Sequence, residues 1–379
     1  MEGNFRIVCS SCGREYEPTS LSWRCSCGAP LDVAMSVEGL EFDTDKFRRR
    51  SASMWRYREF LPLLEENCVV SMGEGFTPLI LKRLWGVELI LKLDYVNPTG
   101  SFKDRGASLM ISNLKALGVR EVAIDSSGNA GAAVAAYSAA AGIRCRVFVP
   151  ADAPIGKRVQ IASYGAELVE VRGPRAEVHR AVMRELGGAV YASHMWNPFF
   201  IEGLKTLAYE CVEQAGPPDA AILPVGSGGL LLGVYRGFIE LRKLGVIDEV
   251  PRMMAVQAAG ITPVYDALHG PYGREPPRAP LADGIAIPHP PRLRQVIDAV
   301  KKSNGDAIVV EDQEIVEAFK LLARMGLFVE PTSAAALAAL EKARAEGAID
   351  KEERIYIPLT GSGLKAIEKI SRICLGLRT

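Results

Sequence analysis

Short β-branched runs alternate with alanine-rich stretches along most of the chain, and this alternation restricts the fold more than any other feature. Residues 121–125 are strand-like with an apolar centre, residues 130–141 are alanine-rich, and residues 144–150 are strand-like again. The strand-like signal recurs at residues 220–225, 252–257 and 354–360. Strands separated by helices pair in parallel, because each helix crosses back over the sheet. The sequence therefore predicts an α/β protein with a parallel sheet, whose ligands bind at the turns that follow the strands.

The size and charge of the chain argue against several functional classes. Its 379 residues suffice for two or three domains, and a content of 48% hydrophobic and 24% charged residues is ordinary for a globular protein. Basic and acidic residues both number 45, so no net field attracts nucleic acid or an anionic membrane. Residues 1–8 resemble neither a signal peptide nor a spanning helix. We therefore expect a cytoplasmic protein with a small-molecule ligand and neither a nucleic-acid nor a membrane partner.

Four of the eight cysteines are spaced as metal ligands near the N-terminus. Cys9 and Cys12 are separated by two residues, twelve residues follow, and Cys25 and Cys27 are separated by one. Four thiolates on two short turns suit tetrahedral zinc. The gap between Cys25 and Cys27 is tighter than the usual two residues, so a redox pair or a ribbon without metal are alternatives. We favour zinc.

The composition of the chain changes after this segment and suggests domain boundaries. We expect residues 1–35 to form a zinc-ribbon-like module and residues 36–70 to form a helical connector. Residues 71–379 would form the catalytic body, with a smaller α/β subdomain at about residues 105–190. The other cysteines have apolar sequence neighbours and are expected to be inert core thiols: Cys68, Cys145, Cys211 and Cys374.

A lysine stands where a turn-forming stretch runs into a helical pattern. Residues 97–106 read Asn-Pro-Thr-Gly-Ser-Phe-Lys-Asp-Arg-Gly, and Lys103 is followed by the helical residues 107–117. An amine at a partly desolvated helix start can condense with a carbonyl group. A solvated surface lysine is the alternative, since most lysines are exposed.

Three further turns join a strand-like run to a helical run. Residues 126–131 (Ser-Ser-Gly-Asn-Ala-Gly) offer backbone N–H groups to an anion such as a carboxylate, or form a simple helix cap. Residues 226–229 (Gly-Ser-Gly-Gly) offer the same groups to a phosphate. Residues 359–365 place a hydroxyl group at the tip of a turn. Four such turns in one chain favour a single cleft for a cofactor with several polar groups.

Several motifs together resemble one enzyme family over nearly the whole chain. Residues 73–79 (Gly-Glu-Gly-Phe-Thr-Pro-Leu) and residues 97–106 match its motifs almost residue for residue. Further matches, in the family's order, are residues 127–131, 202–206, 225–229, 329–334 and 360–365. The chain thus resembles the fold-type II pyridoxal-phosphate enzymes, most closely the threonine synthase family, some of whose archaeal members carry an N-terminal Cys ribbon. The resemblance implies two three-layer α/β domains with the cofactor in the cleft between them, and a homodimer.

The resemblance also implies roles for individual residues. Lys103 would hold pyridoxal 5'-phosphate as a Schiff base and later move the Cα proton of the substrate. The cofactor would further contact Phe102, Asn129, Gly226, Ser227, Gly228, Gly229 and Thr360. The substrate would contact Ser127, Gly128, Asn129, Ala130 and His194. A neutral hydroxyl at Thr360 cannot keep the pyridine nitrogen protonated as a carboxylate would, which favours elimination or replacement over transamination.

The chain departs from the family where the substrate phosphate is held. Threonine synthases resemble one another in an Asn-Ser-x-Asn-Pro-x-Arg stretch, whereas residues 194–200 here read His-Met-Trp-Asn-Pro-Phe-Phe. Ala130 also stands where many members have threonine. His194 could replace a lost phosphate contact or act as an acid, and a structural histidine is the alternative. Residues 281–286 (Leu-Ala-Asp-Gly-Ile-Ala) are similar to a stretch of threonine and serine dehydratases.

We consider two functions as a pyridoxal-phosphate enzyme and two functions of other classes. The first is a lyase of threonine biosynthesis that converts O-phospho-L-homoserine and water into L-threonine and phosphate. The alternative is an L-threonine/L-serine dehydratase, or a β-replacement enzyme on a related amino acid. A non-catalytic amino-acid sensor disagrees with the complete Lys103 motif, and a nucleic-acid-binding ribbon disagrees with the balanced charge.

Overall fold

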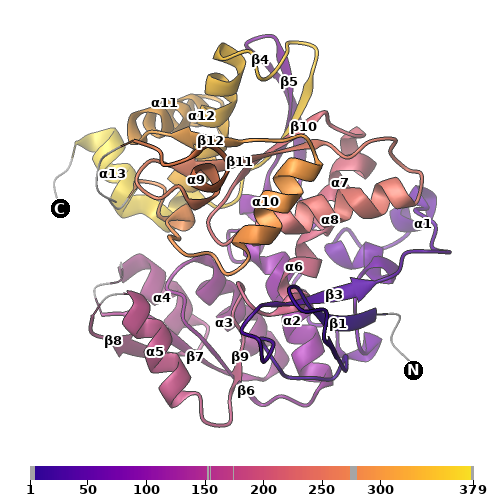
Figure 1. Ribbon diagram of the computed structural model, residues 1–379. Coiled ribbons are helices and arrows are strands. Elements are labelled where there is room, and N and C mark those ends of the chain that lie inside the picture. Colours follow the sequence, from indigo (N-terminus) through magenta and orange to yellow (C-terminus); the bar gives the residue numbers. More distant parts are fainter. Residues whose placement is uncertain (1–4, 152, 154, 174, 274–279, 377–379) are drawn as a thin grey trace. The chain divides into compact units, whose positions relative to one another are not determined.

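The structure is a computed structural model that describes residues 5–151, 153, 155–173, 175–273 and 280–376, shown as a ribbon in Figure 1. The first four residues of the expected N-terminal module lie outside the described residues. The chain forms two compact units that are interleaved in sequence. Unit 1 comprises Met1–Gly75 and Asn97–Thr206, and unit 2 comprises Phe76–Val96 and Leu207–Thr379.

The larger sheet of unit 1 is parallel and has four strands in the order β8-β7-β6-β9. Its strands are β6 (Glu121–Ile124), β7 (Arg144–Pro150), β8 (Glu167–Val171) and β9 (Val190–Tyr191). Val122 in the central strand β6 lies beside Cys145 of β7 and Val190 of β9. β6 and β7 carry fully buried apolar side chains, which is typical of parallel strands covered on both faces. The α/β class predicted from the sequence is confirmed.

The described residues of this part of unit 1 also form the helices α2 (Lys103–Ala116), α3 (Asn129–Ala141), α4 (Ile155–Ser163), α5 (Arg175–Glu185) and α6 (Pro198–Leu204). The alanine-rich α3 packs on β6 and β7, since small side chains allow a close approach. Helix α2 packs between α3 and α6. A Cβ atom on Gly106 would lie 2.5 Å from the ring of Phe200, so only glycine lets α2 and α6 come this close.

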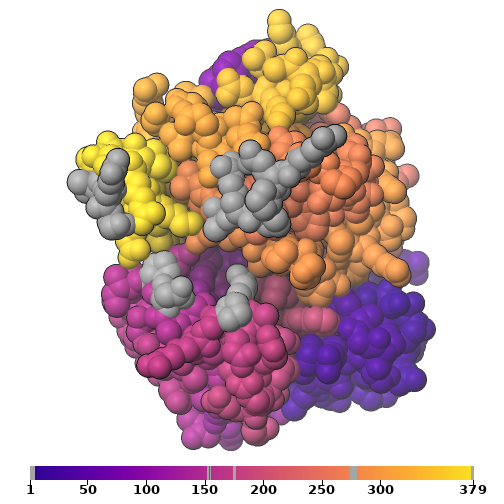
Figure 2. All heavy atoms as spheres, turned by 60° about the vertical axis from the view of Figure 1, so that its left-hand side comes forward, coloured from indigo at the N-terminus to yellow at the C-terminus, as the bar shows by residue number. Residues whose placement is uncertain are grey.

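The N-terminal part of unit 1 contains a separate antiparallel sheet in the order β2-β1-β3. Its strands are β1 (Phe5–Cys9), β2 (Glu15–Tyr16) and β3 (Leu31–Met35). The following stretch contains the short helix α1 (Thr44–Arg48) and two 3-10 turns, η1 (Met54–Phe60) and η2 (Glu66–Cys68). A cluster of aromatic rings holds it together: Phe42, Phe47, Tyr57 and Phe60. The space-filling view shows indigo N-terminal residues at the molecular surface (Figure 2).

Unit 2 is built on a six-stranded sheet in the order β12-β11-β10-β13-β5-β4. Its strands are β4 (Leu79–Leu84), β5 (Val87–Lys92), β10 (Ala220–Pro224), β11 (Arg252–Ala258), β12 (Ala307–Val310) and β13 (Arg354–Pro358). All neighbours are parallel except β4 and β5, which form a hairpin. The sequence analysis predicted β10, β11 and β13 but not the hairpin.

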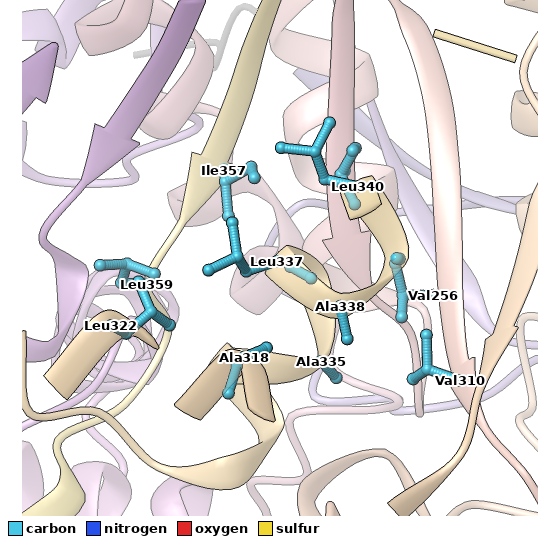
Figure 3. Packing of buried hydrophobic residues seen from close by; sticks show 14 of the residues in the cluster. Val256, Val310, Ala318, Leu322, Ala335, Leu337, Ala338, Leu340, Ile357 and Leu359 are labelled. Carbon is cyan, nitrogen blue, oxygen red and sulfur yellow. The ribbon is translucent and has the colours of Figure 1, made fainter. Parts of the chain in front are cut away.

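Helices cover both faces of this sheet. Alternate residues of β10 and β11, such as Ile222 and Val256, join one core cluster with α11 (Asp312–Arg324) and α12 (Pro331–Ala345), which Figure 3 shows from close by. The intervening residues of the same strands are equally buried, because successive side chains of a strand point to opposite faces. α8 (Gly229–Lys243), α9 (Pro263–His269) and α10 (Leu293–Lys302) also contact these central strands.

The remaining elements of unit 2 are α7 (Thr206–Ala215), whose first residue belongs to unit 1, the 3-10 turns η3 (Asp94–Val96), η4 (Asp283–Ile285) and η5 (Gly363–Ala366), and α13 (Ile367–Leu375). Leu364, Ile367 and Leu375 are exposed, and the yellow atoms of α13 stand at the surface in Figure 2. Among the described residues, none of the helices combines the length and the apolar character that crossing a membrane requires.

Candidate active site

Lys103 is the first residue of α2, at the helix start that the sequence predicts. The loop before it is fixed by Asp104, whose carboxylate accepts hydrogen bonds from the backbone N–H of Thr99 at 2.7 Å and from its hydroxyl. The N–H of Gly100 bonds to the carbonyl of Asn97 at 2.7 Å, and a positive φ of 81° at Gly100 makes this tight turn possible. The approach to Lys103 is therefore held by its own neighbours in sequence.

Aromatic rings line the surroundings of the Lys103 amine. Its Nζ lies 4.5 Å from the ring centroid of Phe102 and 5.9 Å from that of Phe200. Both rings are buried, and Lys103 itself is half-buried. Ring faces attract a cation and exclude water from one side of it. The sequence analysis named Phe102 but missed Phe200 as a neighbour of Lys103.

The corner that carries Ser127 and Asn129 lies between β6 and α3. Gly128 is the N-cap residue of α3 and provides no side-chain cap, and the start of a helix is where an anion is favoured. Gly131 is required here, because a Cβ atom on it would lie 1.8 Å from the carbonyl oxygen of Ser126. The methyl group of Ala130 is buried. The assignment of this corner to a carboxylate remains a prediction.

The glycine-rich corner in unit 2 lies between β10 and α8. Gly228 is the N-cap residue of α8 with φ 86° and no side-chain cap. A Cβ atom on Gly228 would lie 2.4 Å from Cγ2 of Val296, and one on Gly226 would lie 2.9 Å from Cα of Ile285. Residues 226–229 thus form a backbone cradle at the positive end of a helix, which suits a phosphate group. Its close neighbour Ile285 belongs to the stretch 281–286 that the sequence analysis singled out.

Thr360 follows β13 in unit 2 and is buried. Its hydroxyl oxygen lies 2.9 Å from that of Ser333 and 3.5 Å from a carboxylate oxygen of Glu330. The N–H of Gly361 donates to Ser333 Oγ at 3.0 Å, and Ser333 Oγ lies 3.4 Å from the carbonyl oxygen of Gly361. The sequence analysis named only Thr360, although the matching motif at residues 329–334 already contained Glu330 and Ser333.

The structure divides the expected site residues between the two units. Unit 1 carries Phe102, Lys103, Ser127, Gly128, Asn129, Ala130 and His194, and unit 2 carries Gly226, Ser227, Gly228, Gly229 and Thr360. Within unit 1, the buried His194 packs edge-on against Phe200 with ring centroids 5.9 Å apart, and Phe200 in turn faces Lys103. Asn197 caps α6 by accepting the N–H of Phe199 at 3.0 Å.

Two motif carboxylates have structural partners in unit 1. Glu74 is buried and accepts hydrogen bonds from Trp55 and Tyr137, each at 2.8 Å. Burial raises the pKa of the Tyr137 hydroxyl, and the nearby Asp104 and Glu74 carboxylates raise it further. Glu202 forms a buried ion pair with Lys205 at 2.7 Å. These motifs therefore fix the scaffold around α2 and α3.

The four N-terminal thiols converge in unit 1. The Sγ atoms of Cys9, Cys12, Cys25 and Cys27 all lie within 4.8 Å of one another. The Cys9–Cys27 and Cys12–Cys25 separations are 3.5 Å and 3.7 Å. A backbone N–H donated by Cys27 and the Tyr16 hydroxyl lower the pKa of Cys25 to about 5. A thiol in this state is largely thiolate at neutral pH, which is the form that binds metals.

The other cysteines follow the sequence prediction only in part. Cys145 and Cys211 are buried, and burial raises the pKa of both thiols, that of Cys145 to about 12. Cys68 is half-buried. Cys374 is exposed on α13, so the prediction of a core thiol is wrong there. Apolar neighbours in sequence cannot distinguish the inner from the outer face of a terminal helix.

The comparison with known proteins decides the family. A family model described as "Pyridoxal-phosphate dependent enzyme" matches residues 70–361. The chain belongs to the pyridoxal-phosphate-dependent enzyme family. Membership confirms the resemblance described from the sequence.

Within the pyridoxal-phosphate-dependent enzymes, the chain is similar to threonine synthases over nearly its whole length. It is 38% identical to the threonine synthase of Methanocaldococcus jannaschii, with 94% of this chain and 92% of the relative covered. It is 34% identical to that of Methanosarcina acetivorans, with 98% and 94% covered. Among solved structures, maize serine racemase superposes with a TM-score of 0.66 at 25% identity, covering 88% of this chain and 98% of that one. The threonine synthase family and the fold-type II class are thereby confirmed.

Proposed function

We propose that this chain is a pyridoxal-phosphate-dependent lyase that converts O-phospho-L-homoserine and water into L-threonine and phosphate. The observation that carries the proposal is the end-to-end similarity to threonine synthases, in a chain whose Lys103 begins a helix with its amine beside two aromatic rings. All of the expected cofactor contacts lie within the matched range of residues 70–361.

The side chains and backbone of the site fit pyridoxal phosphate. Lys103 offers the amine that binds its aldehyde, and the cradle of residues 226–229, where Cβ atoms on Gly226 and Gly228 would clash, offers N–H groups to its phosphate. When bound, the cofactor supplies an electron sink for the carbanion that forms at the substrate carbon. Phe102 and Asn129 would complete the contacts to its ring.

Thr360 would face the pyridine nitrogen of the cofactor. The hydroxyl of Ser333, 2.9 Å from that of Thr360, would help to orient it. A neutral hydroxyl group is a weak acid and leaves the pyridine nitrogen unprotonated, which favours elimination and replacement at Cβ or Cγ. This chemistry agrees with loss of phosphate from the γ position.

The substrate carboxylate would bind at the start of α3, where Ser127 carries a hydroxyl group and Gly128 and Asn129 are the N-cap and first residue of the helix, which has no side-chain cap. Lys103 would take the Cα proton as general base. Ala130 and Phe200 cannot donate hydrogen bonds to the substrate phosphate through their side chains. We assign part of that role to His194, which is buried beside Phe200 and has two ring nitrogens.

The test is turnover. Purified protein with pyridoxal phosphate and O-phospho-L-homoserine should release threonine and phosphate in equal amounts, and the Lys103→Ala variant should release neither. The dehydratase alternative predicts 2-oxobutyrate from L-threonine instead. Formation of 2-oxobutyrate without any turnover of phosphohomoserine would overturn the proposal.

We also propose that Cys9, Cys12, Cys25 and Cys27 bind one zinc ion. Tetrahedral zinc with sulfur ligands at about 2.3 Å places its sulfur atoms about 3.8 Å apart, close to the separations of 3.5 Å and 3.7 Å found here. Elemental analysis should give one zinc per chain, and the Cys12→Ser variant should lose most of it. Protein that binds no metal but forms a reversible disulfide would favour the redox alternative.

The organisation of the protein is part of the proposal. We propose a ribbon module at residues 1–35, a connector at residues 36–70 and a catalytic body at residues 71–379 with a subdomain at about residues 105–190. We further propose a cytoplasmic homodimer, in line with the expectation from the family. Light scattering of the holoenzyme should give twice the mass of the chain, and a monomer mass would contradict the dimer.

A further inference from the structure

Trp23 connects the Cys cluster to the rest of unit 1. It precedes Cys25 by two residues, and its ring packs edge-on against two aromatic rings of the later chain. The ring centroids lie 5.1 Å from Tyr191 and 5.2 Å from Trp196. The guanidinium of Arg24 covers the Trp23 ring at 4.6 Å from its centroid. Aromatic pairs in this geometry stabilise the contact beyond the area they bury.

Tyr191 links Trp23 to the corner at the start of α3. The Tyr191 hydroxyl donates to a carboxylate oxygen of Asp125 at 2.6 Å, and the other carboxylate oxygen lies 3.1 Å from Nδ1 of His179. Asp125 directly precedes the residues 126–129 that we assign to the substrate carboxylate. Trp23 is therefore connected to this corner through its ring contact with Tyr191 and the hydrogen bond from Tyr191 to Asp125.

Trp196 links Trp23 to the segment that contains His194. Trp196 stands two residues after His194 and directly before the N-cap residue of α6. Two residues after the N-cap residue Asn197, Phe199 packs edge-on against Phe5 of β1, with ring centroids 5.9 Å apart. The N-terminal sheet and its Cys turns thus contact both sides of the start of α6, whose next residue, Phe200, faces Lys103.

The turn that carries Trp23 is held by hydrogen bonds of Cys25 and by a backbone bridge. The N–H of Cys25 donates to the carbonyl of Ala29 at 2.9 Å, and the Tyr16 hydroxyl donates to Cys25 Sγ at 3.1 Å. Arg24 forms an isolated bridge with Pro30. A module of this size buries too little surface to be rigid alone and depends on such local ties.

We propose that Trp23 is a positioning residue for substrate binding. Through Tyr191 and Trp196 it holds the two segments, residues 125–129 and 194–200, that carry the proposed substrate contacts in unit 1. The inference rests on the proposed function for the identity of the substrate, but its structural part is independent of the reaction. Trp23 does not take part in the chemistry, so its loss acts on binding rather than on turnover.

The first experiment measures hydrogen exchange of the holoenzyme with the Trp23→Ala, Trp23→Phe and Leu21→Ala variants. The backbone N–H groups of Ala192, Trp196 and Asn197 are hydrogen-bonded and report on the contacted segment. Trp23→Ala should raise their exchange rates about threefold to tenfold, Trp23→Phe should restore most of the protection, and Leu21→Ala, an exposed side chain of the same loop, should leave it unchanged. Equal exchange in Trp23→Ala and the unchanged protein would overturn the inference.

The second experiment separates KM from kcat with O-phospho-L-homoserine. Trp23→Ala should raise KM about threefold to tenfold with kcat within about twofold, since a displaced binding segment weakens the ground state and the transition state alike. A fall in kcat alone would contradict a positioning role. If the protein turns over no phosphohomoserine at all, the proposed function fails, while the exchange measurement still decides the fate of the Trp23 contact.

A third variant covers the case in which Trp23→Ala does not fold. Tyr191→Phe keeps the ring that Trp23 contacts and removes only the hydroxyl that binds Asp125. It should raise hydrogen exchange at residues 125–131 and leave residues 194–200 protected. Unchanged exchange at residues 125–131 would exclude the route through Tyr191.

Discussion

A Cβ atom on Gly203 would lie 2.2 Å from the carbonyl oxygen of Arg105. This contact fixes how closely α6 approaches α2, and Lys103 stands two residues before Arg105. The packing of the helix that Lys103 begins thus depends on a glycine one hundred residues further along the chain.

Gly203→Ala should push α2 away from α6. We expect a loss of about 1–3 kcal/mol in the free energy of unfolding, the usual cost of overpacking a well-filled contact, and weaker cofactor binding. Denaturant unfolding and titration with pyridoxal phosphate measure the two effects. Gly156→Ala in α4 is the matched control, because nothing lies within 4 Å of its Cβ position, and it should be neutral or slightly stabilising. If Gly203→Ala has the stability and cofactor affinity of the unchanged protein, the two helices can move apart without cost and the contact is not restrictive.

Lys103→Ala should lower the turnover rate about a thousandfold or more, because it removes both the covalent anchor and the general base. The absorption spectrum of the bound cofactor should change as well. Lys115→Ala, an exposed lysine in the last turn of the same helix, should retain both activity and spectrum. An active Lys103→Ala variant would refute the role that we assign to this amine.

Gly228→Ala should weaken cofactor binding at least about tenfold, since the new methyl group meets Val296 in the cradle and the residue keeps a positive φ. Equilibrium dialysis against pyridoxal phosphate measures the loss. Gly245→Ala isolates the conformational cost, because it also has a positive φ but nothing lies within 4 Å of its Cβ position. Equal affinities of the two variants would show that the cradle does not depend on the clash.

The connector should show an acid-sensitive ion pair. Arg50 donates to both carboxylate oxygens of Glu59, and Nζ of Lys46 lies 3.0 Å from Oε1 of Glu59. These bonds lower the pKa of Glu59 to about 2. Because the pKa of Glu59 is lower in the folded protein than in the unfolded chain, its ionised form stabilises the fold at every pH above about 4.5. This stabilisation is lost as the pH falls from 4.5 to about 2.

Comparison of the unchanged protein with Glu59→Gln measures this effect. The difference in the free energy of unfolding should be about 1 kcal/mol at pH 6, reduced by the partial exposure of the pair, and should vanish near pH 2. Glu41→Gln, an exposed carboxylate of the same connector, should show no such pH dependence. A constant difference across this pH range would rule out the ion pair as its cause.

Local patterns in the sequence were sufficient for part of the secondary structure and for the place of Lys103 at a helix start. Helix and strand periodicity predicted β6, α3 and β7, and the turn-to-helix transitions predicted the corners at Gly128 and Gly228. These signals depend on neighbours in sequence, which a single chain displays directly.

The residues that the sequence analysis missed act through contacts between distant segments. Phe200 reaches Lys103 only because α6 packs on α2. Ser333 reaches Thr360, which follows β13, from the helix α12. The fully buried ion pair of Lys92 and Glu210, 2.7 Å apart, is likewise invisible to periodicity. Charged residues in a strand or helix pattern look exposed until their partner is known.

The sheet of unit 2 also constrains when the protein can fold. β5 pairs with β13, and Arg354 bonds to Glu88 across a separation of 266 residues. While the chain is being synthesised, the hairpin of β4 and β5 emerges long before this neighbour, so one edge of β5 has unsatisfied backbone groups for most of that time. Completion of this sheet is a late event, and chains interrupted before β13 should be prone to aggregate through that edge.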